Sequence, residues 1–393
     1  MQRHPELRDK PLAVCGSQEE RHGIVLAANY IAKPYGVKTG MAVWQARQRC
    51  PHLVMLPPDM GEYIRFSQMA REIYEDYTDQ IEPFGLDENW LDVTGSVGMF
   101  GSPMTIAREI SDRMKFELGI TCSIGVADNK IPAKLGSDYK KPDATTVITR
   151  ENFRQIVWPL PVSDLLYVGR AAEQTFQRFG VKTIGDLAAF DRQALFTLLG
   201  KHGVQLHDYA CGLDRSPVSP AGQYTPPKSV GNGFTFPRNL QGREEIRGGI
   251  TQLSDHVAAR LRLCGMKCQG VSLAIRDPDF HDISRQTRLD TPTYLGRELA
   301  RSAMALADQC WSMDRPVRAL TVTAIYLIPA EEAAAQLELW DAPRQHQRER
   351  RERLEQTMDA IRAKYGGRAI QPASAPRGTA STGHDPFPDR EGT

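Results

Sequence analysis

Six segments between residues 229 and 330 alternate between strand-like and helix-like hydrophobic patterns, and this alternation constrains the fold more than any other feature. The patterns predict a strand, a helix, two strands, a helix and a strand over residues 230–236, 244–263, 270–276, 284–289, 295–310 and 319–327. The first helix carries one apolar face, formed by Ile246, Ile250, Leu253, Val257 and Leu261. Because βαββαβ is the ferredoxin-like order, the sequence predicts a ferredoxin-like domain here.

The remaining patterns predict an α+β multidomain chain. Residues 61–149 place strand, helix and strand patterns around an acidic pair, which predicts a sheet domain with helices on one face. Residues 150–216 predict short helices joined by glycine turns, and the proline-rich interval 217–228 predicts an interdomain linker. The predicted boundaries are 1–60, 61–149, 150–216, 217–228, 229–330 and 331–393.

The tail from residue 331 has its own composition. Residues 344–364 predict a highly charged helix, and residues 373–393 are rich in Pro, Gly, Ser and Thr, which predicts disorder.

Composition limits the class of protein. Hydrophobic residues make up 41% and charged residues 25% of the chain, as in an ordinary globular protein, and no apolar run is long enough to span a membrane. The net charge of +1 means that any nucleic-acid binding must come from local patches. Seven scattered cysteines, with no zinc-site spacing around Cys264 and Cys268, and a start without a secretory apolar core predict a reduced cytoplasmic protein.

The strongest candidate for chemistry is the adjacent pair Asp87 and Glu88, followed by an alternating apolar stretch. Neighbouring side chains in a strand point to opposite faces, so the two carboxylates can converge only at a strand end or turn. Gly85 makes such a turn easy. Paired carboxylates there suit Mg²⁺, which takes oxygen ligands and substrate phosphates. The alternative is a solvated acidic pair at a hairpin tip.

Two further regions favour phosphate binding, each with a structural alternative. The glycine turns within residues 150–216 would offer backbone N–H groups to phosphates, or would simply join a small helical bundle. The domain at 229–330 would offer a basic sheet face to a nucleic-acid backbone, or would carry a solvated charged face. Its basic residues near strands are Arg238, Arg243, Arg285, Arg288 and Arg318.

Several motifs together resemble the Y-family translesion DNA polymerases of the DNA polymerase IV group. In chain order these are Asn29 to Met41, Leu86 to Thr94, Cys122 to Lys130, Lys134 to Ser137, Lys140 to Pro142, Lys228 to Gly231 and Gln336 to Trp340. The resemblance covers roughly residues 3 to 365. It implies a right-hand architecture with fingers at 1–60, palm at 61–149, a helix-hairpin-helix-like thumb at 150–216 and a little finger at 229–330.

The resemblance also implies an activity and its residues. The reaction would be template-directed addition of deoxynucleotides to a primer 3′ end, clamped by two Mg²⁺ ions. Asp87 and Glu88 would be metal ligands and catalytic residues, with Glu88 serving the metal at the primer hydroxyl. Tyr30, Lys33 and Lys141 would contact the triphosphate, although the family more often has arginine at the position of Lys33. A packed aromatic is the alternative for Tyr30, and a surface lysine is the alternative for Lys141.

The sequence departs from the family pattern at its start. Family members begin with a strand whose aspartate ligates both metals, whereas Met1 to His4 lead directly into Pro5 to Arg8. Asp92 and Asp128 are the other palm aspartates considered, and Asp92 is interpreted as structural. Our hypothesis is that the reading frame begins upstream of Met1, and DNA sequence there would test it. The competing function is a catalytically inactive scaffold that binds DNA and the clamp.

The segment Gln336 to Trp340 is similar to the sliding-clamp peptide of the family. Its anchors would be Gln336, Leu337, Leu339 and Trp340. The alternative is a tail that packs back on its own domain. The expected partners are therefore primer–template DNA, dNTPs and a sliding clamp, for a monomer that does not bind membranes.

Overall fold

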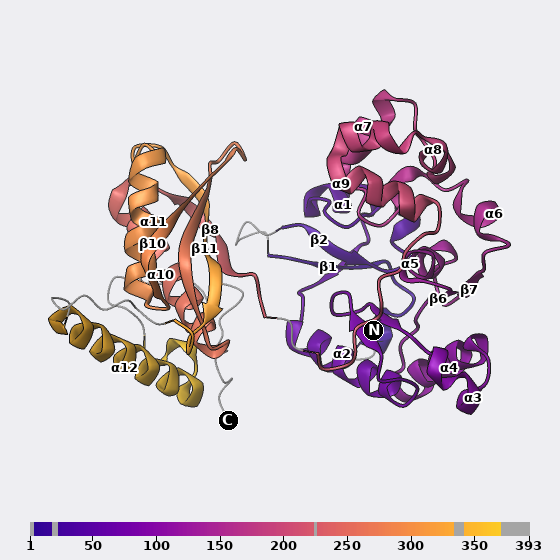
Figure 1. Cartoon of the computed structure of the whole chain (residues 1–393), viewed down its shortest axis with the longest axis horizontal. Coiled ribbons are helices and arrows are strands. Elements are labelled where there is room, and N and C mark those ends of the chain that lie inside the picture. Colours follow the sequence, from indigo (N-terminus) through magenta and orange to yellow (C-terminus); the bar gives the residue numbers. More distant parts are fainter. Residues whose placement is uncertain (1–3, 18–22, 224–225, 334–341, 371–393) are drawn as a thin grey trace. The chain divides into compact units, whose positions relative to one another are not determined.

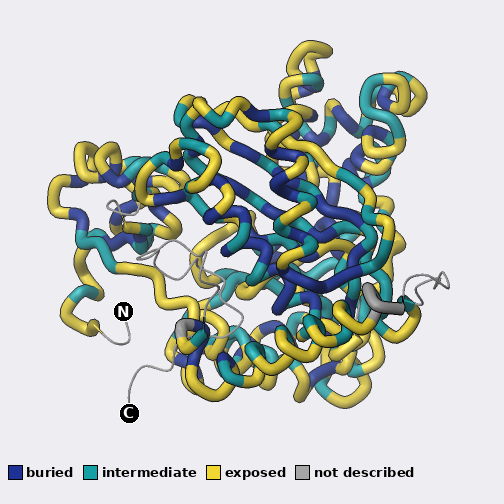
Figure 2. Tube along the Cα trace, turned by 90° about the vertical axis from the view of Figure 1, so that its left-hand side faces the viewer, coloured by how far each residue is buried: buried dark blue, intermediate teal, exposed yellow. Residues whose placement is uncertain are grey.

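The computed structural model describes residues 4–17, 23–223, 226–333 and 342–370 (Figure 1). The chain splits into two compact units, one made of residues 1–8 and 59–224, the other of residues 9–58 and 225–393. Each unit mixes helices and strands, as the predicted α+β class requires. Buried positions concentrate inside the elements, whereas exposed positions gather in the loops and on outward helix turns (Figure 2).

The first unit contains two two-stranded sheets. Strand β4 (Ile81–Pro83) pairs antiparallel with β5 (Asn89–Leu91), and β6 (Ile124–Ala127) pairs parallel with β7 (Thr145–Ile148). Within the described residues these pairs do not join into the single sheet that the sequence pattern suggests. The pattern alternation also ends earlier than expected, because β5 stops at Leu91 and a 3-10 turn follows.

Long helices cover these strands. The helices and 3-10 segments here are η1 (Pro5–Leu7), α2 (Met60–Glu75), η3 (Thr94–Ser96), α3 (Val97–Phe100) and α4 (Pro103–Leu118). Helices α2 and α4 start on side-chain caps from Asp59 and Ser102, which accept from backbone N–H groups of the first turn. Their buried cluster consists of Ala70, Ile73, Tyr77, Ile106, Ile110, Met114 and Leu118.

Helix α5 (Lys130–Tyr139) connects β6 to β7 and packs on β6 at very short range. A Cβ added at Gly125 would lie 1.8 Å from the carbonyl oxygen of Ala133, and one at Gly136 would lie 3.1 Å from the Cα of Gly125. The two glycines therefore let the helix backbone touch the strand backbone.

A helical part completes the first unit. It comprises α6 (Phe153–Val157), η4 (Val162–Asp164), α7 (Arg170–Arg178), α8 (Ile184–Ala189) and α9 (Arg192–Ala210). Helix α9 breaks at Gly200, whose φ of 63° and ψ of −147° are not helical. Ile131 and Leu135 of α5 belong to the same buried cluster as the α7 to α9 core, so the helical part and α5 share one core.

In the second unit, residues 9–58 form a small sheet with one helix. The elements are β1 (Leu12–Cys15), β2 (Val25–Ala28), η2 (Lys33–Tyr35), α1 (Val43–Arg49) and β3 (Val54–Leu56). The strand order is β2-β1-β3, with β2 antiparallel and β3 parallel to β1. Their core consists of Ala13, Cys15, Val25, Ala32, Val37, Val43, Ala46, Cys50 and Leu53.

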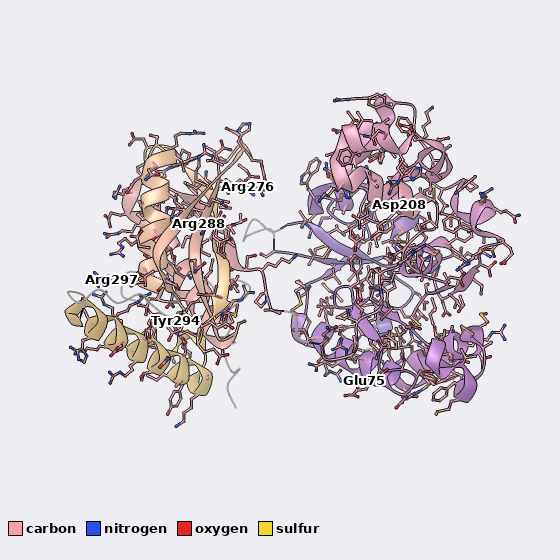
Figure 3. All side chains as sticks on the ribbon, in the orientation of Figure 1. Glu75, Asp208, Arg276, Arg288, Tyr294 and Arg297 are labelled. Atoms are coloured by element: carbon pink, nitrogen blue, oxygen red, sulfur yellow. The ribbon has the colours of Figure 1, made fainter. Side chains whose placement is uncertain are left out.

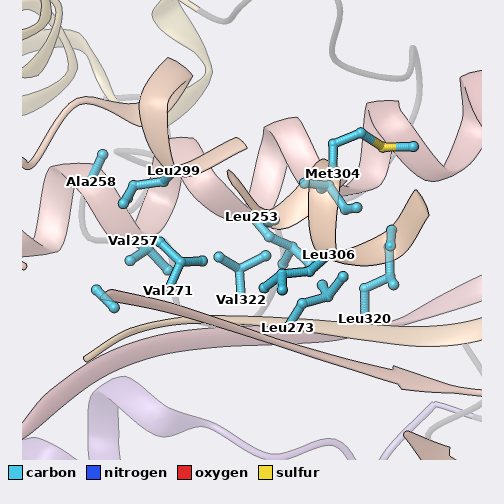
Figure 4. Packing of buried hydrophobic residues seen from close by; sticks show 14 of the residues in the cluster. Leu253, Val257, Ala258, Val271, Leu273, Leu299, Met304, Leu306, Leu320 and Val322 are labelled. Atoms are coloured by element: carbon cyan, nitrogen blue, oxygen red, sulfur yellow. The ribbon is translucent and has the colours of Figure 1, made fainter. Parts of the chain in front are cut away.

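The rest of the second unit has the predicted βαββαβ order. Its elements are β8 (Ser229–Leu240), α10 (Gly242–Leu263), β9 (Met266–Arg276), β10 (Asp282–Thr293), α11 (Gly296–Cys310) and β11 (Val317–Pro329). The element order leaves the strand order open, and the structure places β11 between β8 and β9, in the order β10-β9-β11-β8. The apolar residues of α10 and α11 pack on one face of this sheet (Figure 4).

The predicted charged helix is α12 (Ala342–Tyr365), followed by η5 (Gly367–Ala369). Three acidic side chains of α12 form ion pairs with basic side chains of the βαββαβ domain. Arg262 pairs with Glu355 and Asp359 at 2.5 Å each, and Lys267 pairs with Glu352 at 3.1 Å. Helix α12 thus docks on this domain through ion pairs.

Candidate active site

Asp87 and Glu88 lie on the turn between β4 and β5. The backbone N–H of Phe84 donates to the carbonyl of Glu88 at 2.8 Å, and Gly85 adopts a φ of 99° that favours glycine. Both carboxylates therefore sit at the end of a hairpin, where side chains are free of the strand alternation.

The hairpin is anchored to the N-terminus of α5. The indole N–H of Trp90 donates to the carbonyl of Lys130 at 3.1 Å, and the ring of Phe84 packs on Trp90 at a centroid distance of 4.9 Å. The buried Lys130 ammonium donates to Glu82 at 2.6 Å, and the backbone N–H of Ser219 donates to the same carboxylate at 2.8 Å. Burial alone would raise the pKa of Glu82, but these hydrogen bonds outweigh it and hold the pKa below its ordinary value.

A chain of charges runs from the turn along α5. The ammonium of Lys134 contacts Glu88 at 3.0 Å and Asp138 at 2.7 Å, and Asp138 in turn contacts the ammonium of Lys141 at 2.5 Å. The structure therefore connects Glu88 to Lys141, two of the predicted site residues, through two residues of α5. Asp87 is exposed, and it has no hydrogen-bond or ion-pair partner within the described part of the chain.

These contacts shift two ionisation equilibria. Burial acts to lower the pKa of Lys134, but its bonds to Asp138 and Glu88 outweigh burial and raise the pKa. Burial acts to raise the pKa of Asp138, but its two lysine partners outweigh burial and lower the pKa. Both shifts favour the charged forms of Lys134 and Asp138.

Asp92 and Asp128, the two further aspartates considered from the sequence, lie outside this network. Asp92 accepts from the backbone N–H of Thr94 at 2.9 Å, which fits a turn-stabilising role. Asp128 pairs with the exposed Arg150 at 3.1 Å.

Tyr30 and Lys33 belong to the other compact unit. The Lys33 ammonium lies 4.0 Å from the centroid of the exposed Tyr30 ring, a cation–π arrangement. Asn29 shapes this turn, because its carboxamide oxygen accepts from the backbone N–H groups of Leu12 and Ala32 at 3.0 Å each. The structure brings these two predicted residues together as a pair.

The sequence arguments missed Lys134 and Asp138 as site residues. Their four-residue spacing on a helix is a signal for an ion pair, but the link to Glu88 depends on tertiary packing. The clamp-peptide residues Gln336, Leu337, Leu339 and Trp340 lie outside the described residues.

The basic face predicted for residues 229–330 is smaller than expected. Arg238 pairs with Glu245 at 2.7 Å, and Arg243 pairs with Asp308, so helix acids neutralise both guanidinium groups. Among the described residues, Arg285 and Arg288 have no carboxylate partner. Arg288 lies on β10 along the open sheet and is labelled in Figure 3.

The donor set at the turn fits a hard divalent cation. Asp87 offers an uncommitted carboxylate, and Glu88 offers a second one that is held in place by Lys134. In proteins, Mg²⁺ is usually bound by one or two carboxylates and by the phosphates of the substrate. A second group of possible metal ligands consists of Asp277, Asp279 and His281. It is a weaker candidate for a cation site, because Asp277 already accepts from Arg315 at 3.2 Å and from the backbone N–H of His281 at 2.9 Å.

The fold has a close counterpart among solved structures. A Y-family DNA polymerase chimera superposes with a TM-score of 0.71 at 23% sequence identity, covering 82% of this chain and 94% of that chain. This likeness confirms the predicted class, an α+β multidomain fold with Y-family polymerase architecture.

Sequence comparison identifies the family. The impB/mucB/samB family model matches residues 1–138, and the model of that family's C-terminal domain matches residues 227–339. DNA polymerase IV of Acetivibrio thermocellus is 46% identical over 363 residues, which cover 92% of this chain and 90% of that protein. DNA polymerase IV 1 of Bacillus subtilis is 36% identical, with 93% of this chain and 87% of that protein covered.

The chain belongs to the impB/mucB/samB family and, within it, to the DNA polymerase IV group of Y-family polymerases. The predicted enzyme class, DNA-directed DNA polymerase, is therefore confirmed.

Proposed function

We propose that this chain is an error-prone translesion polymerase, which adds deoxynucleotides to a primer 3′ end by two-metal-ion catalysis during DNA damage tolerance. The observation that carries the proposal is the connected row of Glu88, Lys134, Asp138 and Lys141 beside the free carboxylate of Asp87. It combines acidic ligands with lysines, as a metal–triphosphate substrate requires.

Asp87 and Glu88 would hold the metal, with Mg²⁺ as the proposed ion. When bound, the ions neutralise phosphate charge and make the primer hydroxyl a better nucleophile. Lys134 would orient Glu88, because its ammonium bridges Glu88 and Asp138. Lys141 would neutralise triphosphate charge, and Tyr30 and Lys33 would contact the same triphosphate.

DNA would be held outside the palm as well. Arg285 and Arg288 offer guanidinium groups that no carboxylate in the described residues neutralises, which suits contact with a phosphate backbone. In the described residues, no helix combines the length and apolar character that crossing a membrane requires. The seven free thiols fit the cytoplasm as the compartment, and the proposed form is a monomer.

Primer extension tests the proposal against the scaffold alternative. The assay supplies Mg²⁺, dNTPs and a primer–template, for the chain itself and for a form that carries a family-type aspartate strand before Pro5. Extension that disappears in Asp87→Ala supports the polymerase. DNA binding without extension in both forms would support the inactive scaffold.

The clamp peptide is proposed on sequence alone. Leu339 and Trp340 would fill an apolar pocket on a sliding clamp, where a buried aromatic anchor supplies much of the binding energy. The double variant Leu339→Ala, Trp340→Ala should bind the clamp at least about 10-fold more weakly in a titration, while primer extension without clamp stays unchanged. Unchanged clamp affinity would remove this assignment.

A further inference from the structure

Helix α12 carries charged side chains on two nearly opposite sides, and it lies against α10 of the βαββαβ domain (Figure 1). At 3.6 residues per turn, two sets of charged residues each line up along the helix. The inner stripe consists of Arg348, Glu352, Glu355, Asp359 and Arg362. The outer stripe consists of Arg350, Arg353 and Lys364. The two stripes have different surroundings.

Every residue of the inner stripe forms an ion pair with the βαββαβ domain. The pairs are Arg348 with Glu298 at 3.4 Å, Glu352 with Lys267 at 3.1 Å, Glu355 and Asp359 with Arg262 at 2.5 Å each, and Arg362 with Asp255 at 2.7 Å. Only 7% of the Arg262 side chain and 4% of the Arg362 side chain are exposed. Because separating such a buried pair leaves an unpaired charge in the interior, these contacts hold α12 in one orientation.

The outer stripe has no carboxylate partner among the described residues. Arg350, Arg353 and Lys364 are exposed, and the Lys364 ammonium lies 5.0 Å from the centroid of the Tyr365 ring. Thr357 lies on the same side of the helix, where its hydroxyl donates to the carbonyl of Arg353 at 2.8 Å. The stripe is therefore a line of positive charge with a polar centre.

Negative and positive charges are sorted across α12. Within residues 350–364, every acidic residue belongs to the inner stripe. A helix whose charged face is only solvated typically mixes both signs there, because opposite charges four residues apart then stabilise it. The outer stripe carries one sign of charge, and the ion pairs of the inner stripe hold it in a fixed line.

This line of charge suits a rigid, extended polyanion. From Arg350 to Lys364 the helix rises about 21 Å at 1.5 Å per residue. Duplex DNA carries one phosphate charge for about every 1.7 Å of its axis, so phosphates are available along the whole stripe. A protein partner would need an aromatic or apolar anchor at the centre of its interface, and the polar Thr357 occupies that position.

We propose that the outer stripe of α12 binds the phosphate backbone of duplex DNA. Contacts to phosphates carry no sequence information, so the binding is independent of the base sequence. The stripe lies on a helix that docks against α10 and α11, and it is therefore a different surface from Arg285 and Arg288 of β10. The inference rests on the proposed function, because that function brings duplex DNA to the protein.

The affinity of the full chain for a long blunt DNA duplex, measured over a series of salt concentrations, tests the proposal. The double variant Arg350→Gln, Arg353→Gln should reduce the salt slope by about 1.8, because each phosphate contact contributes about 0.9. It should bind at least about 10-fold more weakly at physiological salt. Glutamine is a helix former of similar strength to arginine, so α12 itself is retained.

Two further variants serve as controls. The double variant Arg350→Lys, Arg353→Lys should keep the wild-type salt slope, because a phosphate contact requires only the charge. The matched control Arg65→Gln, Arg247→Gln also removes two exposed helix arginines, but each of these pairs with a glutamate three residues earlier. It should change the salt slope by less than about 0.5.

Three outcomes would overturn the proposal. The first is an unchanged salt slope in the glutamine double variant, and the second is an equal reduction in the matched control. The third is a lysine double variant that binds as weakly as the glutamine one, because the arginines then act through something other than charge. A wild-type protein that binds no duplex DNA would instead refute the proposed polymerase function, so the two failures are distinguishable.

Discussion

At the scale of single residues, Lys134 holds Glu88 of the acidic turn in place through an ion pair. Its ammonium lies between Glu88 and Asp138 with only 16% of the side chain exposed, so it is committed to both carboxylates. Without it, Glu88 would lose the ion pair that joins it to α5. Lys134 is therefore a positioning residue for the predicted metal ligand.

We predict that Lys134→Gln lowers the rate of nucleotide insertion by about 10-fold, because residues that orient metal ligands typically contribute one to two decades. The concentration of Mg²⁺ needed for half-maximal rate should rise, and Lys134→Arg should restore part of the rate. An unchanged Mg²⁺ dependence with a lower melting temperature would show that Lys134 serves the fold alone.

Glu82 gives a pH-dependent prediction at the same scale. Burial acts to raise the pKa of Glu82, but its bonds to Lys130 and Ser219 outweigh burial and keep the pKa below the ordinary value of 4.5. A carboxyl group whose pKa is lower in the folded state stabilises the fold at pH values above its unfolded-state pKa. This stabilisation is lost as the pH falls through the folded-state pKa. Glu82→Gln should therefore cost about 2 kcal/mol at pH 7.

Thermal unfolding of wild type and Glu82→Gln across pH checks this. The difference in melting temperature should shrink as pH falls below 4.5, because the wild-type carboxylate then becomes protonated as well. A difference that stays constant down to pH 3 would contradict the assignment of Glu82 as an ion-pair partner.

At the scale of elements, the approach of α5 to β6 fixes where Lys134 and Asp138 lie. Gly125 is the contact point, and backbone atoms of Ala133 and Ser137 leave no space for a Cβ. Backbone cannot rotate away as a long side chain can. The helix must therefore shift as a whole if a side chain is added.

Gly125→Ala should accordingly lower the free energy of unfolding by about 3 kcal/mol, as overpacking against rigid backbone does. Gly98→Ala in α3 is the matched control, because nothing lies within 4 Å of a Cβ there. Chemical denaturation of both variants measures the effect. Equal stability of Gly125→Ala and Gly98→Ala would contradict the described packing.

The elements also show what a sequence pattern can and cannot predict. The face with Ile246 and Ile250 was predictable, because burial of one helix stripe follows from a 3.6-residue period. The cap that Glu355 of α12 provides for the backbone N–H of Gly296, at 3.1 Å, joins residues far apart in sequence and carries no local signal. The positive φ of Tyr326 in β11 is likewise not predictable, because the sequence around it follows an ordinary strand pattern.

For the candidate site, the sequence predicted the turn with Asp87 and Glu88 because adjacency and Gly85 are local features. It did not predict the link to Lys141, because that link runs through Lys134 and depends on where the hairpin anchors on α5. The sequence also did not predict that Arg238 and Arg243 pair with acidic side chains of α10 and α11, because these ion pairs depend on how strands and helices pack.

At the scale of the whole molecule, the family membership and the connected charges converge on one enzyme. The relatives named DNA polymerase IV match more than nine-tenths of this chain, so the match includes the acidic turn, the helical part and the βαββαβ domain. Although the net charge is only +1, acidic residues gather at the turn, and β10 carries arginines that have no carboxylate partner among the described residues. We propose that Asp87 and Glu88 are the carboxylates that bind metal in this polymerase.

This metal-binding role is tested by single-nucleotide insertion measured across a Mg²⁺ titration, in whichever form of the protein extends a primer. The variants are Asp87→Asn and, as a matched control, Asp128→Asn, whose carboxylate pairs only with the exposed Arg150 in the described structure. We predict a loss of at least about 100-fold for Asp87→Asn that added Mg²⁺ does not restore, and a change within about twofold for Asp128→Asn. If Asp87→Asn inserts nucleotides at the wild-type rate, Asp87 is not a metal ligand.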